Sequence, residues 1–167
     1  MNRCILPLIT ALTLIFGVYL PKEASAQATA KDLVGTWTLV SITIERDGKK
    51  IDFYGPNPQG QAMYDANGRV SSIITRSDLP KFASNNRQSG TPEENKVVVQ
   101  GSIAYFGTYT VDEAAKTVTY HLEGCSFPNW SGIQRISTFS ISGDELTFTN
   151  PVSSVGVSDQ VVWKRAK

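Results

Sequence analysis

The side chains best suited to acid–base chemistry or to ligand binding gather in residues 104–132. His121, which is the only histidine of the chain, is followed two positions later by Glu123. Side chains two positions apart on a β-strand share one face and lie about 7 Å apart. If this face points into a cavity, a general base meets a carboxylate there, and Arg135 on the next segment could pair with Glu123. A buried ion pair costs desolvation free energy, so an inward placement would indicate function, whereas the alternative is an ordinary solvated outer face.

Aromatic and amide side chains accompany this polar group. Tyrosine suits the wall of a partly polar cavity, because its hydroxyl needs a partner when it is buried, although strand aromatics also build ordinary cores. Phe127, Asn129 and Trp130 fall in a loop, where they suit either the rim of a ligand site or a hydrophobic plug. The candidate ligand-binding residues are Tyr64, Tyr105, Tyr109, His121, Glu123, Phe127, Asn129, Trp130, Arg135 and Phe139.

Other catalytic motifs are missing from the sequence. It contains no G-x-S-x-G element, no phosphate-binding glycine loop and no histidine–cysteine cluster with metal-ligand spacing. We therefore expect no metal and no cofactor. A catalytic alternative remains, in which a cofactor-independent isomerase or cyclase uses His121 as its general base beside Glu123, with Arg135 or a tyrosine stabilising an enolate.

The first residues have the layout of an export signal. A short basic start precedes an uncharged apolar run over residues 5–20, and the small residues Ala-Ser-Ala stand just before Gln27. This arrangement is typical of a cleaved secretory signal, with an uncleaved anchor as the alternative. We expect a signal peptide over residues 1–26, a flexible N-terminus over 27–32 and one domain over 33–167, exported to the periplasm or secreted.

The charge balance and the cysteine count limit the partners of the mature chain. Without residues 1–26, the remaining 141 residues carry 14 basic and 14 acidic side chains. No run of Lys or Arg marks a phosphate-binding face, so we expect no nucleic-acid partner and no membrane partner after signal cleavage. Cys125 is then the single cysteine, so no internal disulfide can form and packing alone holds the fold. We expect a monomer or a homodimer.

Short strand-like segments recur about every ten residues after a long first one. They are expected at 37–45, 60–64, 69–75, 105–111, 117–124, 134–141, 145–149 and 160–165. Asn67-Gly68 between two of them is a strong hairpin signal. This order favours an all-β fold, an eight-stranded antiparallel up-and-down barrel whose closure removes exposed edges. Eight strands leave room for packed side chains or for one small ligand.

Two segments interrupt this pattern or leave it ambiguous. Residues 76–90 form a long irregular stretch, typical of a lid, a binding loop or a mobile segment. A short helix is expected over residues 92–100, because Thr91 and Glu94 form a capping box and Pro92 suits the first helical position. The first strand carries apolar residues on both faces, so its pattern does not decide which face points inward.

Five blocks of the sequence resemble one known family. The blocks are LVGTWTLVS, FYGPNPQGQAMY, FASNNRQSGTPEEN, AYFGTY-VDE and HLEGCSFPNWSG. In this order they resemble the lipocalin-like domain family of bacteria and fungi over residues 33–163, which implies an eight-stranded calycin-type barrel. Gly35-Thr36-Trp37 is similar to the G-x-W opening of true lipocalins. The resemblance implies that Trp37 closes the barrel floor with Arg165 or Lys164 stacked on it.

These observations favour an exported lipocalin-like barrel that binds a small apolar or amphipathic molecule in its interior. The isomerase or cyclase is the first alternative. The second is a non-enzymatic interaction module that dimerises through Val40, Ile42 and Ile44, if these residues lie on the outer face.

Overall fold

The structure is a computed structural model and describes residues 28–167, so the predicted signal peptide lies outside the described residues. The helical segments are α1 (Ala30–Leu33), α2 (Pro92–Gln100) and a single 3₁₀ turn over Pro128–Trp130. The strands are β1 (Gly35–Arg46), β2 (Lys49–Asp52), β3 (Gln59–Tyr64), β4 (Arg69–Thr75), β5 (Ser102–Asp112), β6 (Thr117–Cys125), β7 (Gln134–Ser142), β8 (Glu145–Asn150) and β9 (Asp159–Arg165).

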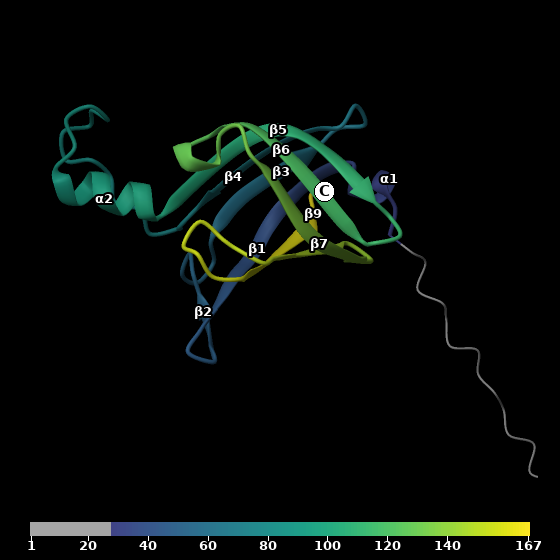
Figure 1. The fold of residues 1–167 in the computed structure, drawn as a ribbon. Helices are drawn as coiled ribbons and strands as arrows, with labels where there is room; N and C mark the ends of the chain where they lie inside the picture. Colours follow the sequence, from purple (N-terminus) through teal and green to yellow (C-terminus); the bar gives the residue numbers. More distant parts are fainter. Residues whose placement is uncertain (1–27) are drawn as a thin grey trace, which may run out of the picture.

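The sheet closes on itself and confirms the predicted eight-stranded antiparallel barrel (Figure 1). Strands β3 to β9 pair in chain order, and the long strand β1 pairs with β3 on one side and with β9 on the other. The sequence pattern did not predict β2, which extends the far end of β1 as a hairpin. All four β2 residues are exposed, so this strand lacks the alternation of buried and exposed side chains that marks the others.

A β-bulge in β1 explains why that strand is apolar on both faces. Trp37 and Leu39 are buried, Val40 is 48% exposed, and Ile42 is buried again. The pairing with β9 skips one residue between Leu39 and Ser41, which shifts the inward-facing set by one position. Both halves of the strand therefore bury apolar side chains. The suggested outer apolar face is wrong for Ile42 and Ile44, which point into the core.

A second irregularity shapes the wall between β5 and β6. The register shifts between Phe106 and Gly107, so that Glu123 on β6 has no partner opposite it. A Cβ atom at Gly107 would lie 2.0 Å from the backbone oxygen of His121, so only glycine allows the two strands to approach this closely. Beyond the bulge the half-buried Cys125 packs against the core.

One end of the barrel is closed by α1 and by a stacked arginine. Trp37 is fully buried and its indole nitrogen donates to the backbone oxygen of Leu33 at 2.8 Å. The Arg165 guanidinium lies 4.2 Å from the Trp37 ring centroid, so Arg165, and not Lys164, is the stacking partner. Its nitrogens donate to the backbone oxygens of Asp32 and Val34 at 2.7 Å and 3.2 Å. This helical turn occupies the segment for which the sequence predicts a flexible N-terminus.

The connection between β4 and β5 stands away from the opposite end of the barrel (Figure 1). Helix α2 has the predicted capping box, and no α2 residue is buried. The Glu94 carboxylate accepts the backbone N–H groups of Thr91 at 2.8 Å and of Ala83 at 2.9 Å, which ties the helix to the preceding loop. None of the helices described over residues 28–167 is long and apolar enough to cross a membrane.

Candidate functional site

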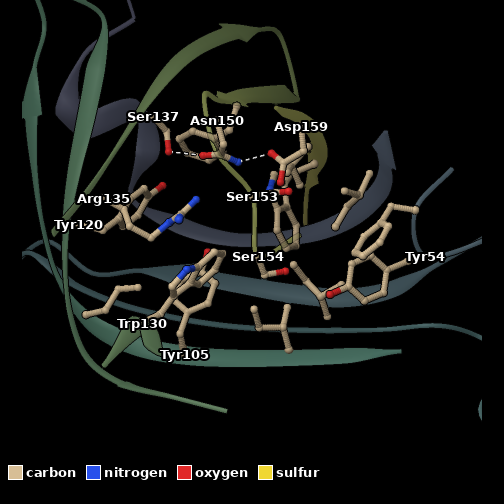
Figure 2. A pocket seen from close by; sticks show the side chains of 18 residues that line it. Tyr54, Tyr105, Tyr120, Trp130, Arg135, Ser137, Asn150, Ser153, Ser154 and Asp159 are labelled. Atoms are coloured by element: carbon tan, nitrogen blue, oxygen red, sulfur yellow. Dashed lines mark hydrogen bonds between the residues drawn. The ribbon is translucent and has the colours of Figure 1, made fainter. Parts of the chain in front are cut away.

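A cavity opens inside the barrel at the end opposite α1. The empty space between its walls is about 690 Å³ when the open solvent at the mouth is counted with it. Its walls come from strand ends and from the loops after β2, β6 and β8 (Figure 2). The lining residues are Ile42, Phe53, Tyr54, Ile74, Ile103, Tyr105, Tyr120, Leu122, Trp130, Arg135, Ser137, Phe148, Asn150, Ser153, Ser154, Asp159, Val161 and Trp163.

Most of the cavity wall is aliphatic or aromatic. Phe53 and Tyr54 form an edge-to-face pair near the mouth, with ring centroids 4.9 Å apart. The predictions that Tyr105 and Trp130 line the cavity agree with their positions. Burial raises the pKa of Tyr54 to about 12, so its phenol stays neutral at physiological pH. An apolar wall of this kind suits the body of an aromatic or aliphatic ligand.

A hydrogen-bonded polar chain crosses three neighbouring strands of one wall. The Ser137 hydroxyl on β7 donates to the side-chain oxygen of Asn150 on β8. The Asn150 amide nitrogen then donates to one carboxylate oxygen of Asp159 on β9 at 2.5 Å (Figure 2). Burial raises the pKa of Asp159, and the hydrogen bond from Asn150 and the charge of Arg135 partly offset that rise. The second carboxylate oxygen makes no hydrogen bond to the described residues.

Arg135 supplies a cation to the same wall. Its guanidinium carbon lies 3.7 Å from the Trp130 ring centroid, and one terminal nitrogen donates to the Val152 backbone oxygen at 2.6 Å. Burial lowers the Arg135 pKa, although Asp159 opposes that change. No Arg135 nitrogen lies within 4.0 Å of an Asp159 oxygen, since the ion pairs of the described residues are Arg69–Glu123 and Arg76–Asp78. The cavity thus contains one cation and one anion that do not touch.

A layer of packed tyrosines separates the cavity from the closed end. The Tyr64 and Tyr120 hydroxyls hydrogen-bond at 2.8 Å, and Tyr109 donates to the backbone oxygen of Asp65 at 2.9 Å. Burial raises the pKa of each of these three phenols. Tyr64, Tyr109 and Phe139, which the sequence suggested as ligand contacts, belong to this core and do not line the cavity.

The sequence left the facing of His121 and Glu123 open, and the structure places both residues outward. In β6 the buried side chains are Val118, Tyr120 and Leu122, so the intervening residues point outward. Glu123 accepts two hydrogen bonds from Arg69, at 2.5 Å and 2.9 Å, on the solvent-exposed surface. The geometry required for catalysis by the histidine–glutamate pair is therefore absent.

The strand register explains why Arg135 faces the interior without them. Tyr120 is the Cα partner of Arg135, whereas His121 is the partner of Gln134. Directly opposed residues share a face of the sheet, so Arg135 joins Tyr120 inside the barrel. The suggested Arg135–Glu123 pair is wrong, because these two side chains lie on opposite faces. A single residue of register decides which charges enter the cavity.

In the loop after β6, Trp130 lines the cavity and Phe127 packs against it. Phe127 packs edge-to-face on Trp130 with ring centroids 5.8 Å apart, and it is half-buried outside the cavity lining. Asn129 is exposed and does not line the cavity. Phe127 thus orients Trp130, and the loop contributes a cation-binding ring to the mouth.

Asp159 and Tyr54 are cavity residues that the sequence analysis missed. Asp159 occupies the same alternating positions as Val161 and Trp163, which are 7% and 2% exposed. An acid that alternates with two core residues along the strand was the available signal of an inward-facing carboxylate. Tyr54 follows a strand that was itself unpredicted, and two nearby prolines made its segment look like an ordinary loop. Among residues 28–167, no three His, Cys, Asp or Glu side chains are grouped so that they could hold a metal ion.

The closed barrel and its single-ended cavity define a protein of the lipocalin type. The family model of the lipocalin-like domain matches residues 34–166, and the chain belongs to this family.

One relative with an assigned role is the 4'-hydroxy-3'-methoxypropiophenone carrier protein ppsC of Aspergillus oryzae. It is 29% identical over 106 residues, which cover 58% of this chain and 96% of the relative. Similar solved structures include a lipocalin-like protein of Bacteroides uniformis, with 16% identity, a TM-score of 0.43, and coverage of 81% of this chain and 99% of that one. A fatty acid transporter has 13% identity, a TM-score of 0.39, and coverage of 83% and 98%.

Proposed function

We propose that this protein is a carrier that binds one small amphipathic molecule in the cavity of its barrel. The observation that carries the proposal is the contrast within the lining, where aliphatic and aromatic walls meet one half-buried polar group made of Arg135, Asp159 and Asn150. Walls of this kind take up the body of a ligand, while a few placed polar groups orient it. The carrier role of the relative ppsC supports the same function.

Most of the affinity comes from removing apolar surface of the ligand from water. Each square ångström of buried apolar surface contributes about 25 cal/mol, before the cost of immobilising the ligand is subtracted. Phe53, Tyr54, Tyr105 and Trp130 provide flat faces and edges on which a ring can pack. An aromatic compound with polar substituents matches this lining, and the relative's propiophenone is one such compound.

A filled-cavity variant tests the proposal. The mature chain is titrated with a panel of aromatic ketones, phenols and fatty acids, and binding is followed by tryptophan fluorescence and by the melting temperature. A ligand that binds only the folded state raises that temperature. Ile103→Trp places a large side chain in the cavity and should abolish the response, whereas Val40→Trp on the outer face should retain it. The proposal fails if no compound binds the unmodified chain, or if Ile103→Trp folds and binds as well as Val40→Trp.

We further propose that the protein is exported and acts after loss of residues 1–26. The support is the sequence pattern alone, with a basic start, an apolar run and small residues before Gln27. Fractionation of the producing cells, followed by mass spectrometry of the N-terminus, tests this. A chain that begins at Gln27 and lies outside the cytoplasm is expected, and an intact cytoplasmic chain would contradict export.

A further inference from the structure

The separated charges of the cavity specify what kind of ligand fits it. We infer that the ligand is uncharged and carries a hydroxyl group and a carbonyl group on one ring or short scaffold, with the hydroxyl donating to Asp159 and the carbonyl accepting from Arg135. This inference rests on the proposed carrier function and adds the chemical class of the ligand.

Arg135 and Asp159 both have hydrogen-bonding capacity that the protein does not use. A guanidinium has five N–H donors, and Arg135 uses one terminal nitrogen on the Val152 oxygen. A carboxylate can accept about four hydrogen bonds, and Asp159 receives one from the Asn150 amide. Each group therefore offers unused capacity, and both line the cavity (Figure 2). A ligand that meets both must provide one acceptor and one donor.

Arg135 and Asp159 are held apart on two strands that are not neighbours. Arg135 lies on β7 and Asp159 on β9, with β8 between them, so their backbones are about 10 Å apart. Arg135 is held on the Trp130 ring and Asp159 on Asn150, so neither is free to swing across and pair with the other. A molecule that bridges them needs two polar groups held apart on one scaffold. A disubstituted aromatic ring is one such scaffold.

The charge balance of the cavity disfavours charged ligands. One cation and one anion in the same cavity leave no net charge for a ligand to neutralise. A carboxylate that docks on Arg135 also brings its charge near Asp159, and repulsion between like charges is stronger in a partly buried site than in bulk water. An ammonium group near Asp159 meets the same difficulty with Arg135. The pair therefore disfavours fatty acids and amines, although the apolar walls alone would accept their hydrocarbon parts.

Three ligands of matched size test the inference. They are 4-hydroxyacetophenone, 4-methoxyacetophenone and 4-acetylbenzoate, measured by calorimetry at a pH where the phenol is neutral. We expect the hydroxyl compound to bind at least about tenfold more tightly than either of the others, because it alone donates to a charged acceptor without adding charge.

The variant Asp159→Asn should reverse the preference for the charged ligand. It removes the anion while an asparagine oxygen can still accept from Asn150, so we expect 4-acetylbenzoate to gain at least about tenfold in affinity and the hydroxyl compound to lose affinity. The matched control is Asp144→Asn, which removes one charge from an exposed turn at the closed end. The backbone oxygen of Asp144 accepts the backbone N–H of Arg165, and the substitution leaves this hydrogen bond in place. It should leave the order of the three ligands unchanged. Circular dichroism and melting temperature confirm that each variant folds.

The outcomes separate the inference from the function on which it rests. Equal or tighter binding of 4-acetylbenzoate by the unmodified chain overturns the inference, and so does a folded Asp159→Asn that keeps the original order. If Asp159→Asn does not fold, Arg135→Gln is tested in its place. An Arg135→Gln variant that binds the hydroxyl compound as tightly as the unmodified chain then overturns the inference. A chain that binds other panel compounds but none of the three ligands retains its carrier function and loses this ligand class. A chain that binds nothing loses both.

Discussion

The barrel has an arginine stacked on a tryptophan at each end, and the two pairs differ in how fully the guanidinium is hydrogen-bonded. At the closed end Arg165 covers Trp37 and donates to two backbone oxygens beside α1. At the open end Arg135 covers Trp130 and donates to one backbone oxygen. Trp37 is fully buried, whereas Trp130 is only partly buried at the mouth of the cavity.

This difference shows how the same residue pair serves stability in one place and binding in another. The closed-end pair satisfies its polar atoms within the protein, so its removal should cost folding free energy. The open-end pair keeps unused donors in a cavity with a second charged group, Asp159, so its removal should cost affinity. The comparison predicts that matched substitutions at the two ends separate stability from binding.

The tryptophans should give the largest difference. Trp37→Ala should lower the free energy of unfolding by about 3–5 kcal/mol, because it leaves a large cavity in a fully buried region. Trp130→Ala should lower it by about 1 kcal/mol and should reduce ligand affinity, since Arg135 loses the ring that holds it. Urea denaturation and calorimetry measure the two quantities. Equal destabilisation by both variants would contradict the division of roles.

The arginines should separate the same two quantities with a smaller effect. Arg165→Met should cost about 1.5–3 kcal/mol of unfolding free energy, because it removes charge-assisted hydrogen bonds to two oxygens next to α1. Arg135→Met should change stability less, because burial already disfavours its charge. Its main effect should be weaker binding of carbonyl ligands, measured by calorimetry. Arg135→Met that binds normally would show that the cation plays no part in the site.

How far the sequence predicts each end follows from the kind of pattern each uses. The closed end uses local signals, such as the G-x-W opening and the resemblance that pairs Trp37 with Arg165 or Lys164, and the first of these two candidates makes the contact. The barrel itself follows from alternation and turn residues, which are also local. The cavity depends on which strand faces point inward, and alternation alone does not determine this.

The errors at the open end come from register and bulges. The suggested pair of Arg135 with Glu123 requires both side chains on one face, and the pairing of Tyr120 with Arg135 puts them on opposite faces. The bulge in β1 turns Ile42 inward although Trp37 and Leu39 already face the core. Such irregularities depend on contacts between distant strands, so a single sequence does not reveal them. Asp159 was open to prediction, since it alternates with Val161 and Trp163 along β9.

The contributions of Asp159 at the open end and of Asp32 at the closed end to the folding stability should depend on pH in opposite directions. Burial raises the Asp159 pKa above its ordinary value of 3.8, so its contribution is most favourable below that value and is lost as the pH rises through the raised pKa. Hydrogen bonds from Thr29 lower the Asp32 pKa below 3.8, so its contribution is present above that value and is lost as the pH falls. Melting temperatures across acidic to neutral pH should show Asp159→Asn gaining stability relative to the unmodified chain as pH rises, and Asp32→Asn losing it. Parallel curves would contradict the opposite environments.

The smallest expected difference concerns two tyrosine hydroxyls, one in the floor of the cavity and one in the wall that follows β2. Tyr120→Phe removes the hydrogen bond to Tyr64 and leaves the Tyr64 hydroxyl buried without that partner, so the unfolding free energy should fall by about 1 kcal/mol or somewhat more. Tyr54→Phe should change it by less than about 0.5 kcal/mol, because the Tyr54 hydroxyl makes no hydrogen bond to the described residues.

The same pair of variants distinguishes a structural hydroxyl from one that meets the ligand. Tyr54 lies in the lining with its phenol kept neutral by burial, so it can donate to a ligand oxygen without adding charge. Tyr54→Phe should therefore weaken the binding of a polar ligand while urea denaturation stays nearly unchanged. If Tyr54→Phe unfolds as readily as Tyr120→Phe, the mouth is as tightly coupled to the core as the closed end is. The contrast between the hydrogen-bonded Tyr120 hydroxyl and the Tyr54 hydroxyl, which has no partner among the described residues, would then not hold.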